Sequence, residues 1–274
     1  MTSYLRSPYE ATPGVTTLPS SLPITGAGLL PVNAYLIRGP QPILVDTGMA
    51  IDRGYFEQAL WSLVDPADLR WIVLTHDDRD HAGNLKEVLM AAPQAKVITN
   101  GLAVARLGEE WDVPPNRVLQ VNPGRTLDLG GRIVSLLRPP AYDSPSTLAL
   151  YDHATRSLFS ADSFGAILPT LAEDAQDIPE SDYLAGMALF TRANAPWTAL
   201  ADPAKFDTVL DDLLRLAPRH ILSSHGATVV EGTETLVKTL REVPSMTPWL
   251  PDEDVLVEAV LAKHEGATLS AGAA

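Results

Sequence analysis

Residues 71–84 read WIVLTHDDRDHAGN, a short apolar run followed by a dense group of histidines and aspartates. The run WIVL predicts a buried β-strand, so the polar side chains would lie at its carboxyl end, where active sites gather in layered α/β folds. A spacing of two along an extended backbone would aim His76, Asp78 and Asp80 to one side, with His81 beginning a helical turn. This geometry suits two adjacent metal ions, one on His76 and Asp78 and one on Asp80 and His81. The alternative interpretation is a solvated acidic loop.

The sequence around this stretch alternates strand and helix patterns, which is typical of an α/β layered fold. Two β-rich runs at residues 33–38 and 42–45 flank a Gly-Pro turn and predict a hairpin. Apolar spacing predicts helices at residues 51–64 and 84–91, and a short β-rich run predicts a strand at residues 96–98.

The second half of the chain repeats this opening. Residues 146–162 again form two short β-rich runs around a turn and again end in an aspartate, which suits a sandwich of two similar halves. A further strand is expected at residues 221–222. More helices are expected at residues 182–192, 205–216, 233–241 and 252–264.

The chain has 274 residues, which fits one large domain. We expect an N-terminal extension with the first strands at residues 1–30, one domain over residues 31–265, and a disordered tail at residues 266–274. No linker within residues 31–265 is long enough to divide that domain.

Composition excludes several classes of function. The chain has no cysteine, which removes disulfides, thiolate zinc sites and iron–sulfur ligation. A net charge of -14 argues against nucleic-acid and membrane partners, because both carry negative charge. No stretch approaches the roughly 20 apolar residues of a membrane span. The polar N-terminus lacks the apolar run of a signal peptide, so a cytoplasmic location is expected.

Two later strands also end in polar residues that suit a buried site. Asp162 follows the run LFSA, and His225 follows the run ILSS. Polar side chains at the exits of buried strands need a polar partner or a ligand. Ser223 and Ser224, directly before His225, are candidates for hydrogen bonds that orient such a ligand-binding group.

These stretches together resemble the metallo-β-lactamase superfamily. THDDRDHAG resembles its T-H-x-H-x-D-H-x-G motif, and VDTG at 45–48, LFSADSF at 158–164 and ILSSHG at 221–226 resemble its other landmarks in the same order. The resemblance covers about residues 32–226 and implies a four-layer αβ/βα sandwich with metals at one edge, between the sheets. It implies that Asp162 bridges two metals and that Asp46 lies near them without binding. The implied ligands are His76, Asp80, His81, Asp162 and His225.

Two positions depart from the zinc hydrolases of this superfamily. Asp78 stands where those enzymes carry a histidine, and Asp143, in AYDSPS at 141–146, stands where they carry another. A carboxylate at the first position resembles the flavodiiron branch. One at the second resembles the diiron hydroxylase domains of peptide-antibiotic assembly lines. The full predicted set is His76, Asp78, Asp80, His81, Asp143, Asp162 and His225.

The added carboxylates set the expected cofactor. Hard oxygen ligands shift preference from zinc toward iron or manganese, so we expect two metal ions, iron ahead of manganese or zinc. The sequence after Gly226 is too short for a flavodoxin module, so no flavin is expected in this chain. Tyr142 adjoins Asp143 and is the candidate for donating a proton to a bound oxygen species, although packing is its more ordinary role.

The leading hypothesis is therefore a diiron oxidoreductase or oxygenase that binds or activates O2 or a related diatomic with electrons from an external donor. One alternative is a two-metal hydrolase of an ester, lactone, thioester or phosphodiester. A second is a non-enzymatic oxygen sensor, and a third is a degenerate fold without metal. A small-molecule or diatomic substrate and a separate redox partner follow from the leading hypothesis, and the resemblance implies a homodimer.

Overall fold

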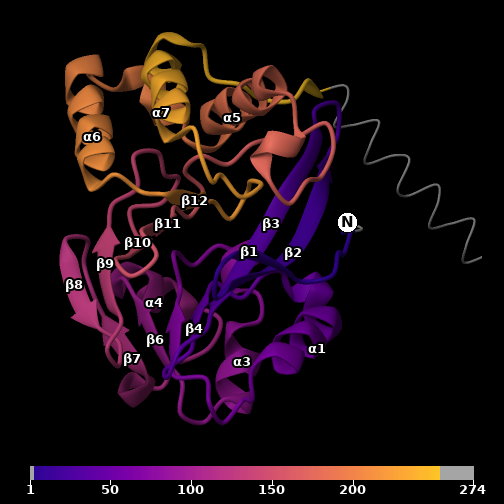
Figure 1. The fold of residues 1–274 in the computed structure, drawn as a ribbon, viewed down its shortest axis with the longest axis vertical. Coiled ribbons are helices and arrows are strands. Elements are labelled where there is room, and N and C mark those ends of the chain that lie inside the picture. Colours follow the sequence, from indigo (N-terminus) through magenta and orange to yellow (C-terminus); the bar gives the residue numbers. More distant parts are fainter. Residues whose placement is uncertain (1–2, 254–274) are drawn as a thin grey trace, which may run out of the picture.

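The computed structural model describes residues 3–253, which form two β-sheets with helices outside them (Figure 1). The first sheet has seven strands in the order β1-β2-β3-β4-β5-β6-β7, and the second has five in the order β12-β11-β10-β9-β8. The strands of the first sheet are β1 (Tyr9–Thr12), β2 (Val15–Ile24), β3 (Gly28–Ile37), β4 (Ile43–Val45), β5 (Trp71–Val73), β6 (Lys96–Thr99) and β7 (Val118–Gln120). Those of the second are β8 (Arg125–Asp128), β9 (Ile133–Leu137), β10 (Ala149–Asp152), β11 (Ser157–Phe159) and β12 (His220–Leu222).

Helices fill most of the connections. The α-helices are α1 (Arg53–Leu63), α2 (Arg79–Ala82), α3 (Leu85–Ala91), α4 (Gly101–Leu107), α5 (Glu180–Asn194), α6 (Pro203–Leu216) and α7 (Thr233–Glu242). Short 3-10 turns are η1 (Ala50–Asp52), η2 (Pro115–Arg117), η3 (Ala175–Asp177), η4 (Pro196–Leu200) and η5 (Val243–Ser245). No helix within residues 3–253 is long and apolar enough to cross a membrane.

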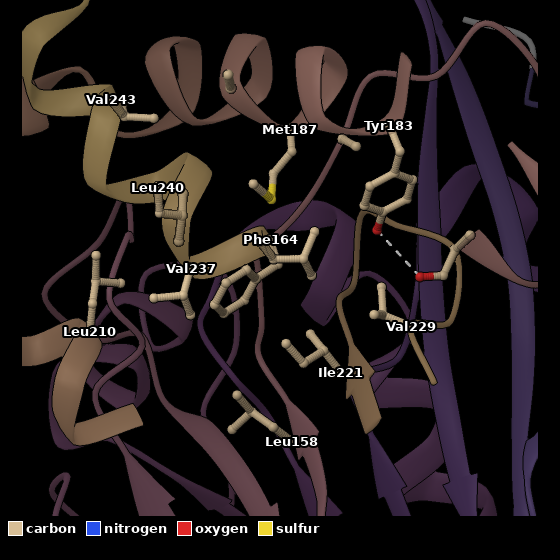
Figure 2. Close-up of a cluster of buried hydrophobic side chains, with 14 of the residues drawn as sticks. Leu158, Phe164, Tyr183, Met187, Leu210, Ile221, Val229, Val237, Leu240 and Val243 are labelled. Carbon is tan, nitrogen blue, oxygen red and sulfur yellow. Dashed lines mark hydrogen bonds between the residues drawn. The ribbon is translucent and has the colours of Figure 1, made fainter. Parts of the chain in front are cut away.

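Three separate cores give the molecule four layers. One core packs α1 and α3 against the outer face of the first sheet, with Leu60 and Val88 among its buried residues. A second lies between the two sheets, where Tyr35 and Phe159 meet edge to face at 5.3 Å between ring centroids. The third packs α5, α6 and α7 on the second sheet around Phe164 (Figure 2). The predicted four-layer αβ/βα sandwich is confirmed.

The β2–β3 hairpin extends well beyond the body of the first sheet. Strand β1 pairs with β2 only as far as Thr17, and β4 pairs with β3 only from Tyr35 onward. Prolines at positions 19, 23 and 31 lie where β2 and β3 pair only with each other and no strand pairs with their outer edges. The missing N–H of a proline is tolerated at such an edge. The far end of β3 instead contacts the second half of the chain: Leu29 and Leu168 exchange two backbone hydrogen bonds of 2.8 Å.

Most predicted elements are present with small shifts in their ends. The expected helices at 51–64, 84–91, 182–192, 205–216 and 233–241 correspond to α1, α3, α5, α6 and α7. Both expected hairpins form, as β3–β4 and β10–β11. Helix α4 and strands β7, β8 and β9 were not predicted. Most of the expected helix at 252–264, and the expected tail at 266–274, lie outside the described residues.

Candidate metal centre

The loop after β5 carries four of the predicted ligands. Its backbone stays extended as far as Asp78, whose carbonyl oxygen then accepts the N–H of His81 at 3.0 Å. This hydrogen bond starts α2 at Arg79, so Asp80 lies on a helical turn. The expectation that His76, Asp78 and Asp80 share one extended run is therefore wrong for Asp80. It approaches the same centre from the helical turn that also presents His81.

Three buried histidines are each anchored through the Nδ1 atom of the ring. The anchor of His76 is its chain neighbour, Thr75 Oγ1, at 3.0 Å. The other two come from distant parts of the chain: Asp46 Oδ2 for His81 at 2.9 Å and the Pro31 carbonyl oxygen for His225 at 2.7 Å. Each anchor leaves the Nε2 atom of its ring free to face a ligand. Histidines that bind metals in proteins are held in this way by a carboxylate, carbonyl or similar group on the other nitrogen.

Three loops of the second half supply the remaining candidates. Asp143 lies between β9 and β10, Asp162 follows β11 and His225 follows β12. Because β11 and β12 are parallel neighbours, the chain leaves both strands at the same edge of the sheet. That edge brings Asp162 Oδ1 within 3.4 Å of His225 Nε2.

All seven predicted side chains meet in one cluster. Their possible ligand atoms form three groups, and within each group the atoms lie within 4.8 Å of one another. Two histidines belong to two groups each, which connects all three. The groups are His76, Asp78 and Asp143; His76, His81 and Asp162; and Asp80, His81 and His225.

The middle of this cluster holds buried polar atoms that the protein itself leaves unsatisfied. His76 Nε2, His81 Nε2 and Asp162 Oδ1 are buried and make no hydrogen bond within residues 3–253. His81 Nε2 and Asp162 Oδ1 lie 3.1 Å apart but lack the geometry of a hydrogen bond. Buried polar atoms without partners are costly, and these three can all give lone pairs to a cation. The residues present therefore fit a metal centre.

The charges of the cluster depend on one another. Although burial favours the neutral acid, the surrounding histidines hold the pKa of Asp162 well below its usual range. Burial lowers the pKa of the His81 imidazole. Nearby carboxylates, Asp80 first, outweigh burial and raise that pKa well above the usual value. Burial raises the pKa of Asp143 to about 6, against the lowering effect of a nearby histidine. A bound cation would therefore stabilise the four clustered aspartates.

Asp46 organises the centre without facing it. Its carboxylate is 1% exposed and accepts the backbone N–H of Thr75 at 2.8 Å and the Thr75 hydroxyl at 2.9 Å. Its Oδ2 atom also lies 2.9 Å from His81 Nδ1 and accepts the Ser224 hydroxyl at 3.3 Å. Ser223 caps the turn before His225 by accepting its backbone N–H at 3.2 Å. Both serines thus make hydrogen bonds beside the centre, as the sequence predicts.

A second network ties the two halves of the centre together, and the sequence did not indicate it. Asp77 Oδ1 accepts the Ser146 hydroxyl at 2.8 Å, and Asp77 Oδ2 lies 3.5 Å from the Arg106 guanidinium. Arg106 also donates to Ser144 Oγ at 2.9 Å. The loop of His76 is thereby fixed to the loop that carries Asp143. Asp77, Ser144 and Ser146 lie inside the motif stretches but Arg106 does not, so only the fold reveals the contacts that join them.

Tyr142 makes packing contacts. Its ring lies 5.1 Å from the Trp197 ring, centroid to centroid, and the Arg138 guanidinium carbon lies 5.0 Å from its centroid. Its backbone carbonyl accepts the indole N–H of Trp197 at 2.6 Å. A role for the Tyr142 hydroxyl as proton donor stays a prediction.

The other candidates have local partners. Arg79 is 95% exposed at its side chain and pairs with Glu110 at 3.6 Å. His153 Nε2 lies 2.8 Å from Ser135 Oγ, and His220 Nδ1 lies 3.0 Å from Ser157 Oγ. His264 lies outside the described residues.

The segment between Asp162 and His225 packs on the centre. The Phe190 ring on α5 lies 5.1 Å from the His225 ring. Asn194, the last residue of α5, donates from Nδ2 to Asp162 Oδ2 at 3.0 Å. The sequence does not single out Asn194, because an asparagine at a helix end is ordinarily a cap.

Comparison with known proteins agrees with this fold. The family model of the metallo-beta-lactamase superfamily matches residues 27–220. A putative diflavin flavoprotein A 1 of Thermosynechococcus vestitus is 37% identical over 135 residues, 49% of this chain and 24% of that protein. An anaerobic nitric oxide reductase flavorubredoxin of Salmonella arizonae is 32% identical over 137 residues, 48% of this chain and 28% of that protein. The matched stretch thus spans about a quarter of these curated relatives.

The fold is also similar to that of solved structures. A flavo di-iron protein of Thermotoga maritima, solved as a single-residue mutant, superposes with a TM-score of 0.74. The match has 20% sequence identity and covers 89% of this chain and 62% of that one. The predicted resemblance to the diiron branch of the family is confirmed by these relatives.

Proposed function

The chain belongs to the metallo-β-lactamase superfamily, and from this premise we propose that it is a binuclear iron protein that binds or activates O2 or NO. The observation that carries the proposal is the set of buried, unsatisfied ligand atoms at the middle of the histidine–aspartate cluster. The names of the relatives support the direction, since one is a nitric oxide reductase flavorubredoxin and another a flavo di-iron protein.

The cluster divides into two metal positions. Asp162 lies between them, because its Oδ2 atom is 3.7 Å from His76 Nε2 and its Oδ1 atom is 3.1 Å from His81 Nε2. Asp162 is therefore the residue suited to bridge. The other ligands of the first position are His76, Asp78 and Asp143, and those of the second are Asp80, His81 and His225.

The donor set favours iron. Four carboxylates balance the charge of two divalent ions, and hard oxygen donors favour iron or manganese over zinc. When bound, the iron pair supplies the electrons that a diatomic ligand takes up. Asp46 holds the ring of His81 in one tautomer and orientation. Phe190 and Trp197 pack on the loops of the centre and limit the access of water.

The electrons for such a reaction come from an external donor in our proposal. The matched stretch covers only 24% and 28% of the two curated relatives, so their full activities are not carried over. We propose a separate redox protein as the donor and a homodimer as the working form. The proposal places the chain in the cytoplasm.

Elemental analysis of protein purified without added metal or chelator tests the proposal. The expected result is about two iron atoms per chain, with O2 or NO consumed when a chemical reductant is supplied. Two zinc atoms with no diatomic consumption, or no metal at all, would overturn it. A variant with His153→Ala, which alters a histidine outside the cluster whose side chain contacts Ser135 and the Tyr151 ring, should keep its iron.

A cleft beside the centre favours a second candidate function. The cleft has a volume of about 850 Å³, is open to solvent, and is lined in part by Asp78 and Asp80. That space accommodates a substrate larger than a diatomic, as a two-metal hydrolase requires. Turnover of an ester and lactone panel by the purified protein, lost in Asp80→Ala, would establish this candidate in place of the first.

A further inference from the structure

Asn194 touches the centre from a segment that carries none of the candidate ligands. It ends α5, and its side-chain amide donates to Asp162 Oδ2 at 3.0 Å. Two neighbours on the same segment approach the same side of the centre. Phe190 packs on the His225 ring at 5.1 Å, and Trp197 donates to the carbonyl beside Asp143 at 2.6 Å. The end of α5 is thus fixed against three loops of the second half.

The hydrogen bond distinguishes the two oxygens of Asp162. Oδ1 has no hydrogen-bond partner among residues 3–253 and faces His81 and His225, at 3.1 and 3.4 Å from their Nε2 atoms. Oδ2 faces His76 Nε2 at 3.7 Å and accepts the Asn194 amide. A carboxylate held at one oxygen cannot rotate about its Cβ–Cγ bond without breaking that hydrogen bond. Asn194 therefore keeps one oxygen turned toward each metal position.

We propose that Asn194 is a positioning residue that holds Asp162 in its bridging orientation and thereby supports the first metal position, that of His76, selectively. The inference rests on the proposed binuclear centre. Without the Asn194 amide, the carboxylate can pivot on Oδ1, with χ1 and χ2 changing together, so that Oδ2 leaves His76 while Oδ1 stays between His81 and His225. The first position would lose a bridging oxygen and the second would not.

The chain offers a matched control two residues earlier on the same helix. Arg192 Nε donates to the Thr247 carbonyl at 2.6 Å and tethers the end of α5 to the segment after η5. Arg192→Ala removes that tether and makes no change at Asp162. Asn194→Leu removes the amide donor and keeps the branching of the side chain at Cγ. Asn194→Gln restores an amide on a longer side chain.

The experiment is an anaerobic Fe(II) titration of metal-free full-length protein against a chromophoric chelator, which yields one dissociation constant for each position. In Asn194→Leu we expect one constant to weaken by about 10- to 100-fold, as is typical when an outer partner of a ligand is lost, and the other by less than about threefold. Asn194→Gln should recover part of the loss. Mössbauer spectra of ⁵⁷Fe-loaded protein should show a change in one iron signal only.

Each other outcome overturns the inference. Equal weakening of both constants, or the same pattern in Arg192→Ala, would mean that Asn194 only stabilises α5. No change in Asn194→Leu would mean that the hydrogen bond is dispensable. Wild-type protein that binds fewer than two Fe(II) ions would overturn the binuclear centre as well, which separates failure of the proposed function from failure of the role of Asn194.

Discussion

Strands β3, β4 and β5 of the first sheet and strands β10, β11 and β12 of the second have the same local topology. In each set the first two strands are antiparallel and the third runs parallel to the second. An aspartate follows the middle strand, Asp46 in one set and Asp162 in the other. A histidine follows the third strand, His76 in one and His225 in the other. The similarity that the sequence shows between residues 32–48 and 146–162 thus has a counterpart in the fold.

The two aspartates nevertheless have opposite surroundings. Both oxygens of Asp46 accept hydrogen bonds from protein donors, Thr75 among them. Asp162 has one oxygen bonded to Asn194 and one without a partner among the described residues. The strand end brings a carboxylate to the centre in both sets, and the donors around it decide whether it orients other ligands or binds a ligand itself.

The largest effect on metal binding is expected at Asp162, whose Oδ1 atom has no hydrogen-bond partner among the described residues. Asp162→Asn should weaken metal binding by more than the roughly 100-fold typical of an outer partner, because it replaces one bridging oxygen with an amide nitrogen and removes the negative charge shared by both positions. Elemental analysis after dialysis measures the metal retained. Asp152→Asn is the matched control, since Asp152 is equally buried on β10 but pairs with Arg132 at 2.6 Å. Full metal retention in Asp162→Asn would remove the contrast between the two aspartates.

A smaller and different effect is expected at Asp46, both of whose carboxylate oxygens accept hydrogen bonds. Asp46→Asn leaves the direct ligands in place but disturbs the anchor of His81, so metal affinity should fall by about 10- to 100-fold. The metal-free protein should also lose about 1–3 kcal/mol of unfolding free energy, because buried donors lose an ionised acceptor. Chemical denaturation in the presence of chelator measures this loss. If Asp46→Asn retained as little metal as Asp162→Asn, Asp46 would do more than orient His81.

Two glycines test how closely each half packs beside the centre. A Cβ on Gly83 would lie 2.6 Å from the backbone oxygens of Arg79 and Gly48. One on Gly165 would lie 2.6 Å from the Phe190 ring and 2.8 Å from His225 Cβ. Alanine at either position should cost about 1–3 kcal/mol by overpacking.

The two alanine variants should differ in metal retention. A Cβ on Gly165 presses on His225 and Asp162, two candidate ligands, so Gly165→Ala should also release metal. A Cβ on Gly83 meets only backbone atoms of residues that are not candidate ligands, so Gly83→Ala should act mainly on stability. Gly54→Ala in α1 has open space and should stabilise by up to about 1 kcal/mol. Thermal unfolding and metal content on the same samples measure both effects. Equal metal loss in Gly83→Ala and Gly165→Ala would erase the difference between the halves.

The sequence singles out the first half of the candidate centre because its residues are contiguous. Four candidate ligands fall within residues 76–81, directly after a recognisable strand. Asp143, Asp162 and His225 lie far apart, and only the resemblance of short motifs connects them. The one error within the motif concerns Asp80, since spacing alone cannot show that the hydrogen bond from His81 to Asp78 starts a helix there.

Residues that support the centre only through tertiary contacts have no recognisable pattern in the sequence. Asn194 and Arg106 belong to no motif and sit at the ends of helices, where polar residues are common. Strands β7 and β8 are short and largely exposed, so they lack the apolar runs that mark buried strands. Strand β9 has the apolar run IVSLL and is mostly buried, and it was missed although this signal was present. Only the folded chain shows that these parts support the centre.

The hydrogen bond between His225 and the Pro31 carbonyl joins residues 194 positions apart. Such a contact closes a very long loop, and the entropy of that closure must be met before the contact contributes anything. The extended end of β3 therefore cannot orient His225 until both sheets have assembled. Folding kinetics should follow from this arrangement. Metal ions would enter a nearly complete molecule, slowing its unfolding rather than nucleating its folding.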